Sequence, residues 1–333
     1  MRILNLILYC SAIVLSACSN ENISDIICPV VTPENIQKQT HRERLFLSSS
    51  VKEIREYKID AENPSEKMLS CIMTFDRSGN LTGYDPSGIG ADPSLRWLPV
   101  FREVYTYRYD GKGRLSEVTA QAGMDIKNYR LEYGDHDTFV PLPFELKPVG
   151  NILLEGLVSV SCDEGNFSYV FDGREAIKVT SEFDVVEEDF YYFESKYPSR
   201  KISKKRYDGE EVRLAETIYS YNPKSGVATA ADETVTEDGR VMKIRSVFMP
   251  AGLPASVYTD NGESQQKRYT YNPYNWLLKM EAEVDGISNG TLKCLYDTDA
   301  QNNWIRREQT VKGFVDWEYP EGVEITIREI AYW

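Results

Sequence analysis

The stretch that decides the fold is "YRYDGKGRLSEV" (107–118), in which two strand-like runs meet at a compact polar turn. Asp110 follows the aromatic Tyr109, and its side chain can accept hydrogen bonds from the backbone of the turn. Gly113 supplies the positive φ angle that a tight turn needs. The stretch therefore predicts two strands joined by an aromatic-Asx turn.

The same pattern returns along the chain, for example in "TFDRSGNLTGY" (74–84) and "LYDTDAQNNWIRREQ" (295–309). The candidate copies of the aromatic position are Phe75, Tyr109, Tyr133, Phe171, Phe193, Tyr221, Phe248, Tyr271 and Tyr296. A second turn signal, which we call the Gly turn, lies between copies at Asp208-Gly209, Asp238-Gly239, Asn261-Gly262, Asp285-Gly286 and Lys312-Gly313. Asx-Gly pairs are typical of tight hairpins. Each unit of about 25 residues therefore predicts strand, aromatic-Asx turn, strand and Gly turn.

Alternation along the strands predicts which face each side chain occupies. In "LLKMEAEV" (277–284), Leu278, Met280, Ala282 and Val284 share one face, and the charged residues share the other. Such a sheet has one buried and one watered face, whereas a transmembrane barrel needs an apolar band toward lipid and a polar interior. We expect an all-β, antiparallel up-and-down meander of hairpin repeats in contact with water. It would form a large barrel, either closed or curled into two packed faces. The C-terminal "VEITIREIAYW" (323–333) should be a paired strand.

Tyr-Asp-x-x-Gly-Arg-Leu at 109–115 and Phe-Asp-x-x-Gly-Asn-Leu at 75–81 resemble the YD repeats of RHS-type proteins. The layout of residues 45–333 is similar to that of secreted bacterial lipoproteins of unknown function whose domain is described as porin-like. The resemblance implies a long antiparallel meander and implies no enzyme. The repeats here are fewer and less regular than those of true RHS shells.

Two insertions rich in Pro and Gly interrupt the repeat, at 84–101 and 138–156. A closed barrel of some eighteen strands would have a lumen too wide for strand side chains to fill, so the insertions are candidates for a plug or a cap. Because loops vary without disturbing strand pairing, we also expect any ligand to touch them. Tyr84, Trp97 and Phe144 are the candidate ligand contacts, and the alternative is that they fill the barrel.

The N-terminal residues predict where the protein is located in the cell. Residues 1–17 have the basic start and short apolar core of a signal peptide. Leu15-Ser16-Ala17-Cys18 resembles the lipobox of bacterial lipoproteins, which implies lipidation of Cys18 and cleavage before it. Ser19 favours the outer membrane, on either its periplasmic or its extracellular face. Residues 18–44 predict a tether containing a solvated His41, and residues 45–333 predict one β-domain.

Charge and cysteine content narrow the partners. The formal net charge of −14 argues against nucleic acid and against adhesion to anionic lipid surfaces. No second long apolar run follows the signal peptide, so we expect the lipid anchor to be the only membrane attachment. Cys28, Cys71, Cys162 and Cys294 are widely spaced and are best interpreted as isolated buried thiols, although an oxidising compartment permits disulfides.

The search for catalytic motifs finds no HExxH, GxSxG, P-loop or dinucleotide-binding turn. Asp135-His136-Asp137 and similar acidic clusters lack the length of an EF-hand loop and are expected to be solvated turns, so no metal or cofactor is predicted. The sequence favours a non-catalytic envelope protein that binds a glycan or a protein ligand. The alternatives are a passive structural component of the envelope and a carboxylate-dependent glycoside hydrolase.

Overall fold

The computed structural model describes residues 41–48, 50–59, 65–86, 103–164, 167–222, 228–314 and 321–333. Its elements are α3 (His41–Arg44), β1 (Val51–Ile59), β2 (Lys67–Phe75), β3 (Leu81–Asp85), β4 (Glu103–Tyr109), β5 (Leu115–Ala122), β6 (Asp125–Tyr133), β7 (Phe139–Pro141), β8 (Leu153–Glu155), β9 (Leu157–Cys162), β10 (Phe167–Phe171), β11 (Glu175–Glu182), β12 (Val185–Phe193), β13 (Pro198–Tyr207), β14 (Glu210–Tyr221), β15 (Ala228–Glu237), β16 (Arg240–Phe248), β17 (Pro254–Asp260), β18 (Ser264–Tyr271), β19 (Leu277–Val284), β20 (Ile287–Thr298), β21 (Trp304–Lys312) and β22 (Gly322–Tyr332).

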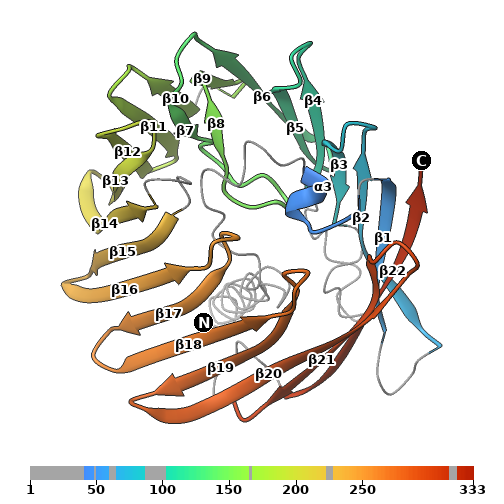
Figure 1. Ribbon diagram of the computed structural model, residues 1–333. Helices are drawn as coiled ribbons and strands as arrows, with labels where there is room; N and C mark the ends of the chain where they lie inside the picture. The colour runs from blue at the N-terminus through green and yellow to red at the C-terminus, as the bar shows by residue number, and fades with distance from the viewer. Residues whose placement is uncertain are drawn as a thin grey trace, which may run out of the picture.

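These strands form a closed antiparallel barrel. Its 20-stranded sheet contains every strand except β7 and β8, which pair with each other. Neighbours in the sheet are neighbours in the chain, with two exceptions: β6 pairs with β9 across the β7–β8 insertion, and the first strand pairs with the last. The C-terminal strand β22 pairs with β1, so that Ile330 lies opposite Ile54, and this pairing closes the ring (Figure 1). The predicted meander is confirmed, and it closes instead of curling into two packed sheets.

The aromatic-Asx turn is a structural unit that recurs around one rim. Eight of the nine predicted aromatic residues end a strand, namely Phe75, Tyr109, Tyr133, Phe171, Phe193, Tyr221, Phe248 and Tyr271. In the turn after Tyr109, the Asp110 N–H donates to the Arg114 carbonyl, and the Gly113 N–H donates back to the Asp110 carbonyl. The same two backbone hydrogen bonds recur at Asp76, Met249, Asn272 and Asp299.

A β-bulge accompanies each of these turns where the two strands pair. Tyr109 pairs with Leu115, whereas the preceding Arg108 pairs with Glu117, so that Ser116 is the extra residue. The pairing shifts by one residue in the same way just before Phe75 and Tyr271. Because a bulge bends its strand and increases the local twist, its repetition helps to curve the sheet into a barrel.

The bulge corrects one predicted strand face. Tyr271 pairs with Leu277 and Thr270 pairs with Lys279, which leaves Leu278 as the bulged residue. Leu277 is therefore buried and Leu278 is 37% exposed, the reverse of the simple alternation expected for this strand. Met280 and Ala282 lie beyond the bulge and are buried as predicted.

The last aromatic-Asx turn is also displaced from its predicted position. Asp299, not Asp297, accepts hydrogen bonds from the turn backbone, and strand β20 runs on to Thr298. Tyr296 lies on the strand before the turn, and its hydroxyl donates to the Leu277 carbonyl at 2.9 Å. Tyr271 makes the equivalent bond to the Pro254 carbonyl, so the repeat keeps this contact although its turn has moved by two residues.

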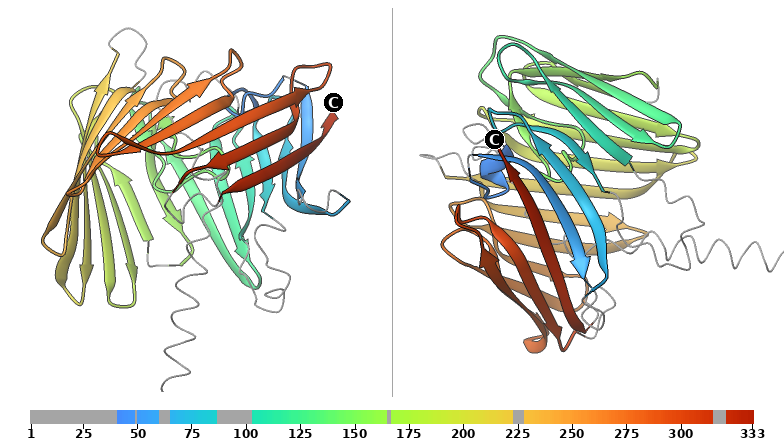
Figure 2. Two further views of the ribbon diagram at one scale, coloured as in Figure 1. Left: turned by 90° about the horizontal axis from the view of Figure 1, so that it is seen from below. Right: turned by 90° about the vertical axis from the view of Figure 1, so that its right-hand side faces the viewer.

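The Gly turns occupy the other rim. The pairs Asp208-Gly209, Asp238-Gly239 and Asp285-Gly286 have positive φ angles at both residues, and each connects its two strands directly. This is the type I′ geometry that matches the right-handed twist of a hairpin. The two turn signals in the sequence thus mark opposite ends of the barrel, as Figure 2 shows for the hairpin tips.

The 138–156 insertion fills one side of the lumen. Figure 1 shows β7, β8 and α3 on the inner side of the ring. Val140 and Leu146 have no exposed surface and belong to a hydrophobic cluster that also contains barrel residues such as Ile54 and Tyr169. The Tyr169 hydroxyl donates to the Pro141 carbonyl at 2.6 Å, and this bond fixes the insertion to the barrel wall. The predicted plug is present in this segment.

The outward face of the barrel carries ion pairs. Arg206 lies 2.6 Å from Glu188, and Arg268 lies 2.7 Å from Glu283. These residues alternate along their strands with inward residues such as Tyr191 and Ala282, which are buried. Charged pairs of this kind suit water and not the apolar band that faces lipid in a transmembrane barrel. In the part of the chain described above, no helix is long and apolar enough to cross a membrane.

Candidate functional site

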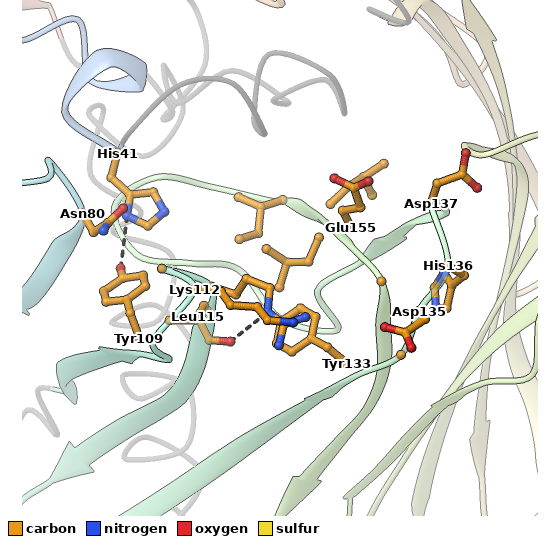
Figure 3. A pocket seen from close by; sticks show the side chains of 17 residues that line it. His41, Asn80, Tyr109, Lys112, Leu115, Tyr133, Asp135, His136, Asp137 and Glu155 are labelled. Atoms are coloured by element: carbon orange, nitrogen blue, oxygen red, sulfur yellow. Dashed lines mark hydrogen bonds between the residues drawn. The ribbon is translucent and has the colours of Figure 1, made fainter.

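A cavity of about 650 Å³ opens at the rim of the aromatic-Asx turns, where the β7–β8 insertion meets the barrel (Figure 3). Its walls come from α3, from the turns after β2 and β4, from the loop after β6 and from β8. The lining residues are His41, Asn80, Tyr109, Lys112, Gly113, Arg114, Leu115, Tyr133, Gly134, Asp135, His136, Asp137, Ile152, Leu153, Leu154, Glu155 and Gly156.

One wall is the aromatic-Asx turn that follows β4. The Asp110 carboxylate accepts hydrogen bonds from the backbone N–H groups of Lys112 and Arg114, both at 2.9 Å, and from the Arg114 Nε at 2.8 Å. Burial alone would raise the pKa of the Asp110 carboxyl, but these hydrogen bonds outweigh it and hold the pKa below its ordinary value. The turn is therefore a rigid wall.

The two cationic side chains of this turn differ in how they are held. The Arg114 guanidinium is paired with Asp110 and lies over the Tyr133 ring, 4.3 Å from its centroid, so its position is fixed. Lys112 is exposed, and none of the ion pairs found in the described residues involves it. Lys112 is thus the cation of this turn that remains available to a ligand.

The rear of the cavity is formed by α3, and here a prediction was wrong. His41 was expected to be solvated in the tether, but its side chain is only 8% exposed. Its Nδ1 accepts a hydrogen bond from the Leu81 N–H at 3.0 Å and lies 3.2 Å from the Tyr109 hydroxyl. Arg42 is also buried and donates to the carbonyls of Val51 and Arg77. These contacts attach the end of the predicted tether to the barrel mouth.

The opposite wall is acidic. Asp135, Asp137 and Glu155 all have exposed side chains, and Figure 3 shows them at the end of the cavity away from His41. Asp137 lies 3.5 Å from Lys196 in an exposed ion pair. The loop that carries Asp135 approaches β8 closely, because a Cβ at Gly156 would lie 3.0 Å from the Gly134 carbonyl oxygen. Gly156 also has a φ of 75°, so glycine is required at this contact.

His136 is the least satisfied group of the cavity. Its Nδ1 accepts a hydrogen bond from the Thr138 N–H at 3.3 Å, and its ring lies 4.9 Å from the Phe171 ring. The Nε2 atom is buried and has no hydrogen-bond partner among the described residues. The ring is therefore positioned mainly by packing.

The floor of the cavity is apolar. Leu115, Ile152 and Leu153 are buried at its base, and charged groups stand around the edge. Donors on one wall and acceptors on the other, over an apolar floor, can hold a ligand that carries both hydroxyl or amide groups and an apolar face. No grouping of three His, Cys, Asp or Glu side chains suited to a metal ion occurs among the described residues.

Two of the three predicted contact residues, Tyr84 and Phe144, do not line this cavity. Tyr84 is 9% exposed in the barrel core, and Phe144 is half-buried against Tyr129, with ring centroids 4.6 Å apart. Both residues make ring contacts within the barrel, and ligand binding by them stays a prediction. Trp97 and Cys18 lie outside the described residues. Cys71 and Cys294 are buried as predicted, Cys162 is half-buried, and no disulfide joins these three cysteines.

Lys112 and Glu155 were not predicted as site residues. Both occupy positions at which neither the turn motif nor strand pairing specifies the residue type. Lys112 is an unspecified position of the aromatic-Asx turn, and Glu155 ends the insertion. In the sequence, the position of the cavity is marked by the end of the 138–156 insertion, where the repeat resumes, and not by the aromatic residues of that insertion.

Comparison with known proteins supplies little further information. No protein family model matches the sequence, and no curated protein matches it. A porin-like protein from Bacteroides uniformis has a similar structure, with 10% sequence identity and a TM-score of 0.36 over 84% of this chain and 98% of that chain.

Two further structures are also similar, each at 12% identity. They are the Photorhabdus luminescens Tc holotoxin pore (TM-score 0.24) and the TcdB2-TccC3-Cdc42 complex (TM-score 0.23). The similarity spans 77% and 74% of this chain but only 16% and 15% of those chains. At these identities the comparisons concern the fold alone, and the resemblance to YD repeats stays a prediction.

Proposed function

We propose that this protein is a lipid-anchored, non-catalytic component of the outer membrane that binds a glycan or a protein segment in the cavity at the barrel mouth. A closed antiparallel barrel is compatible with an envelope location. The ion pairs on its outward face suit attachment by a lipid at Cys18 better than insertion of the barrel itself. Membrane association would then come from the anchor, and recognition from the barrel.

The observation that carries the proposal is the cavity itself, between the β4–β5 turn and the plug. Mouths of β-barrels are common ligand sites, and a volume near 650 Å³ is enough for a disaccharide-sized group or a few peptide residues. Lys112 provides a donor at one side, whereas Asp135 and Glu155 provide acceptors at the other. A neutral or zwitterionic ligand with several hydrogen-bonding groups satisfies both sides, whereas a simple anion would meet the acidic wall.

The test is to probe glycan and peptide arrays with residues 19–333, which are the mature chain without its lipidated Cys18. The Lys112→Ala variant should lose at least about tenfold in affinity for the hits, because one charge-assisted hydrogen bond contributes roughly 1.5 kcal/mol or more. Lys312→Ala is the matched control. Lys312 is also an exposed lysine before a glycine, but it lies at the opposite rim. The Glu155→Gln variant tests the acidic wall in the same way.

Hits that weaken with Lys112→Ala and Glu155→Gln but persist with Lys312→Ala support the cavity as the site. Hits that are equal for all variants place binding elsewhere. An absence of hits favours a passive structural role. Chain cleavage of an arrayed glycan would point to the three carboxylates of the cavity acting as a hydrolase instead.

A further inference from the structure

A second distinctive surface lies at the opposite rim, at the tips of two neighbouring hairpins. We define the tip patch as residues 182–185 and 207–211, which join β11 to β12 and β13 to β14. The two tips touch, because the Asp208 N–H donates to the Asp184 carbonyl at 2.9 Å. Phe183 is 95% exposed and Tyr207 is 57% exposed, so each of the two touching tips presents an aromatic side chain to solvent.

The positive φ angle of Phe183 is unfavourable for the stability of the fold. Phe183 has a φ of 53° and is the first of the two residues that connect β11 to β12. Glycine is the usual residue at this position, since an L side chain is strained at positive φ. The β5–β6 hairpin shows the ordinary solution, with Gly123 at a φ of 63° in the same place. Phe183 thus carries backbone strain and, being exposed, gains almost no packing in return.

The aromatic pair is surrounded by carboxylates. Glu182, Asp184, Glu210 and Glu211 are all exposed, and none of the ion pairs found in the described part of the chain involves them. The nearest basic residues on β13 are already used, as Lys205 pairs with Glu187 and Arg206 pairs with Glu188. The patch is therefore apolar at its centre and acidic at its edge.

We propose that the tip patch docks a protein partner whose surface presents Lys or Arg side chains around an apolar pocket. Exposed aromatic side chains within a charged rim are the usual anchors of protein interfaces. The acidic edge favours a basic partner and disfavours an anionic lipid surface. Backbone strain at an exposed residue is typical of functional sites. Here the strain at Phe183 is offset when its ring inserts into the apolar pocket of the partner. The patch is independent of the mouth cavity, which opens at the other rim.

The experiment selects peptides from a random display library on the immobilised mature chain and compares variants for binding to them. The selected peptides should combine Lys or Arg with an aromatic or large aliphatic residue. Phe183→Gly should weaken their binding at least tenfold while leaving the melting temperature unchanged or raised by up to about 2 °C, because glycine relieves the strained φ. Met124→Ala, at the exposed tip of the β5–β6 hairpin, is the matched control and should bind normally.

Charge tests the other half of the proposal. The Glu182→Gln, Asp184→Asn double variant should also bind at least fivefold more weakly, and the difference from the unaltered chain should shrink at high salt. Selected peptides without basic residues, or equal binding by Phe183→Gly, would overturn the proposal. Phe183-dependent binding to vesicles of phosphatidylethanolamine and phosphatidylglycerol, with no peptide selected, would overturn it in favour of a lipid surface.

Discussion

Two neighbouring aspartates at the end of β20 provide a sharp test of how the repeat is built. The Asp299 carboxylate accepts hydrogen bonds from the backbone N–H groups of Gln301 at 2.9 Å and Asn303 at 3.0 Å, and from the Tyr332 hydroxyl. Asp297 directly follows Tyr296, as the sequence motif requires, but its side chain is 66% exposed and its ion pair with Arg306 spans 3.7 Å. The structure therefore assigns the turn to Asp299.

The expected costs of replacing each residue by Ala differ accordingly. Asp299→Ala leaves two turn N–H groups and one hydroxyl without their acceptor. An analogous loss at a helix cap costs about 0.5–2 kcal/mol, and a hydrogen bond to a charged group contributes about 1.5–3 kcal/mol. Because water can reach part of the turn, we expect about 2 kcal/mol for Asp299→Ala. Asp297→Ala should cost about 0–0.5 kcal/mol, as for other exposed ion pairs.

Thermal unfolding followed by circular dichroism measures both variants. At pH 7 we expect a fall in melting temperature of roughly 4 °C or more for Asp299→Ala and about 1 °C or less for Asp297→Ala. Burial opposes ionisation of Asp299, but the hydrogen bonds from Tyr332, Asn303 and Gln301 lower its pKa. Its contribution is thus complete above the ordinary carboxyl pKa and is lost as the pH falls through the lower folded value. Equal effects of the two substitutions, or a larger effect of Asp297→Ala, would refute this assignment.

Three further predictions concern the plug, the contact beside the cavity and the anchor. Leu146→Ala should destabilise the protein by about 2–5 kcal/mol in chemical denaturation, because Leu146 has no exposed surface, whereas Met124→Ala at a 99% exposed position should cost about 0.5 kcal/mol or less. Gly156→Ala should lower the melting temperature by several degrees through strain at its positive φ and contact with a carbonyl, whereas Gly111→Ala, with open space around its Cβ position, should have little effect. Cys18→Ala should release the protein from the membrane fraction or leave it uncleaved, and unchanged lipid labelling in that variant would contradict the anchor.

Most of the architecture could be predicted from the sequence because its signals are local. An aromatic residue, an Asx side chain and a glycine within seven residues, as at Tyr109, Asp110 and Gly113, specify a turn whatever the rest of the chain does. Repetition of that turn then orders the strands. The two errors in strand register, at Leu278 and Asp297, arise because these sequence signals are local. The alternation of apolar and polar residues cannot show that Leu278 is a bulged residue. The sequence motif likewise points to Asp297, because the hydrogen bonds that place the turn at Asp299 are visible only in the structure.

The site was less predictable because the closure of the barrel creates it. His41, Lys112 and Glu155 are far apart in the chain, and no sequence period connects them. The burial of His41 depends on the Leu81 N–H, which lies forty residues away. The sequence analysis did identify 138–156 as the segment that breaks the repeat. Aromatic contacts were expected there, whereas Phe144 packs against Tyr129 and the cavity is lined by residues 152–156, at the end of the segment.

Hydrogen–deuterium exchange of the 138–156 segment tests most directly the claim that it is a plug built into the barrel and forms one wall of the cavity. The Leu142 N–H donates to the Ile152 carbonyl at 2.7 Å, and Leu146 and Gly150 exchange backbone hydrogen bonds at 3.0 and 2.8 Å. These amides should exchange as slowly as those of β5 and β9, because opening them requires the core to open. Exchange as fast as that of the exposed tip at Met124 would contradict the account, since it would place the segment outside the barrel.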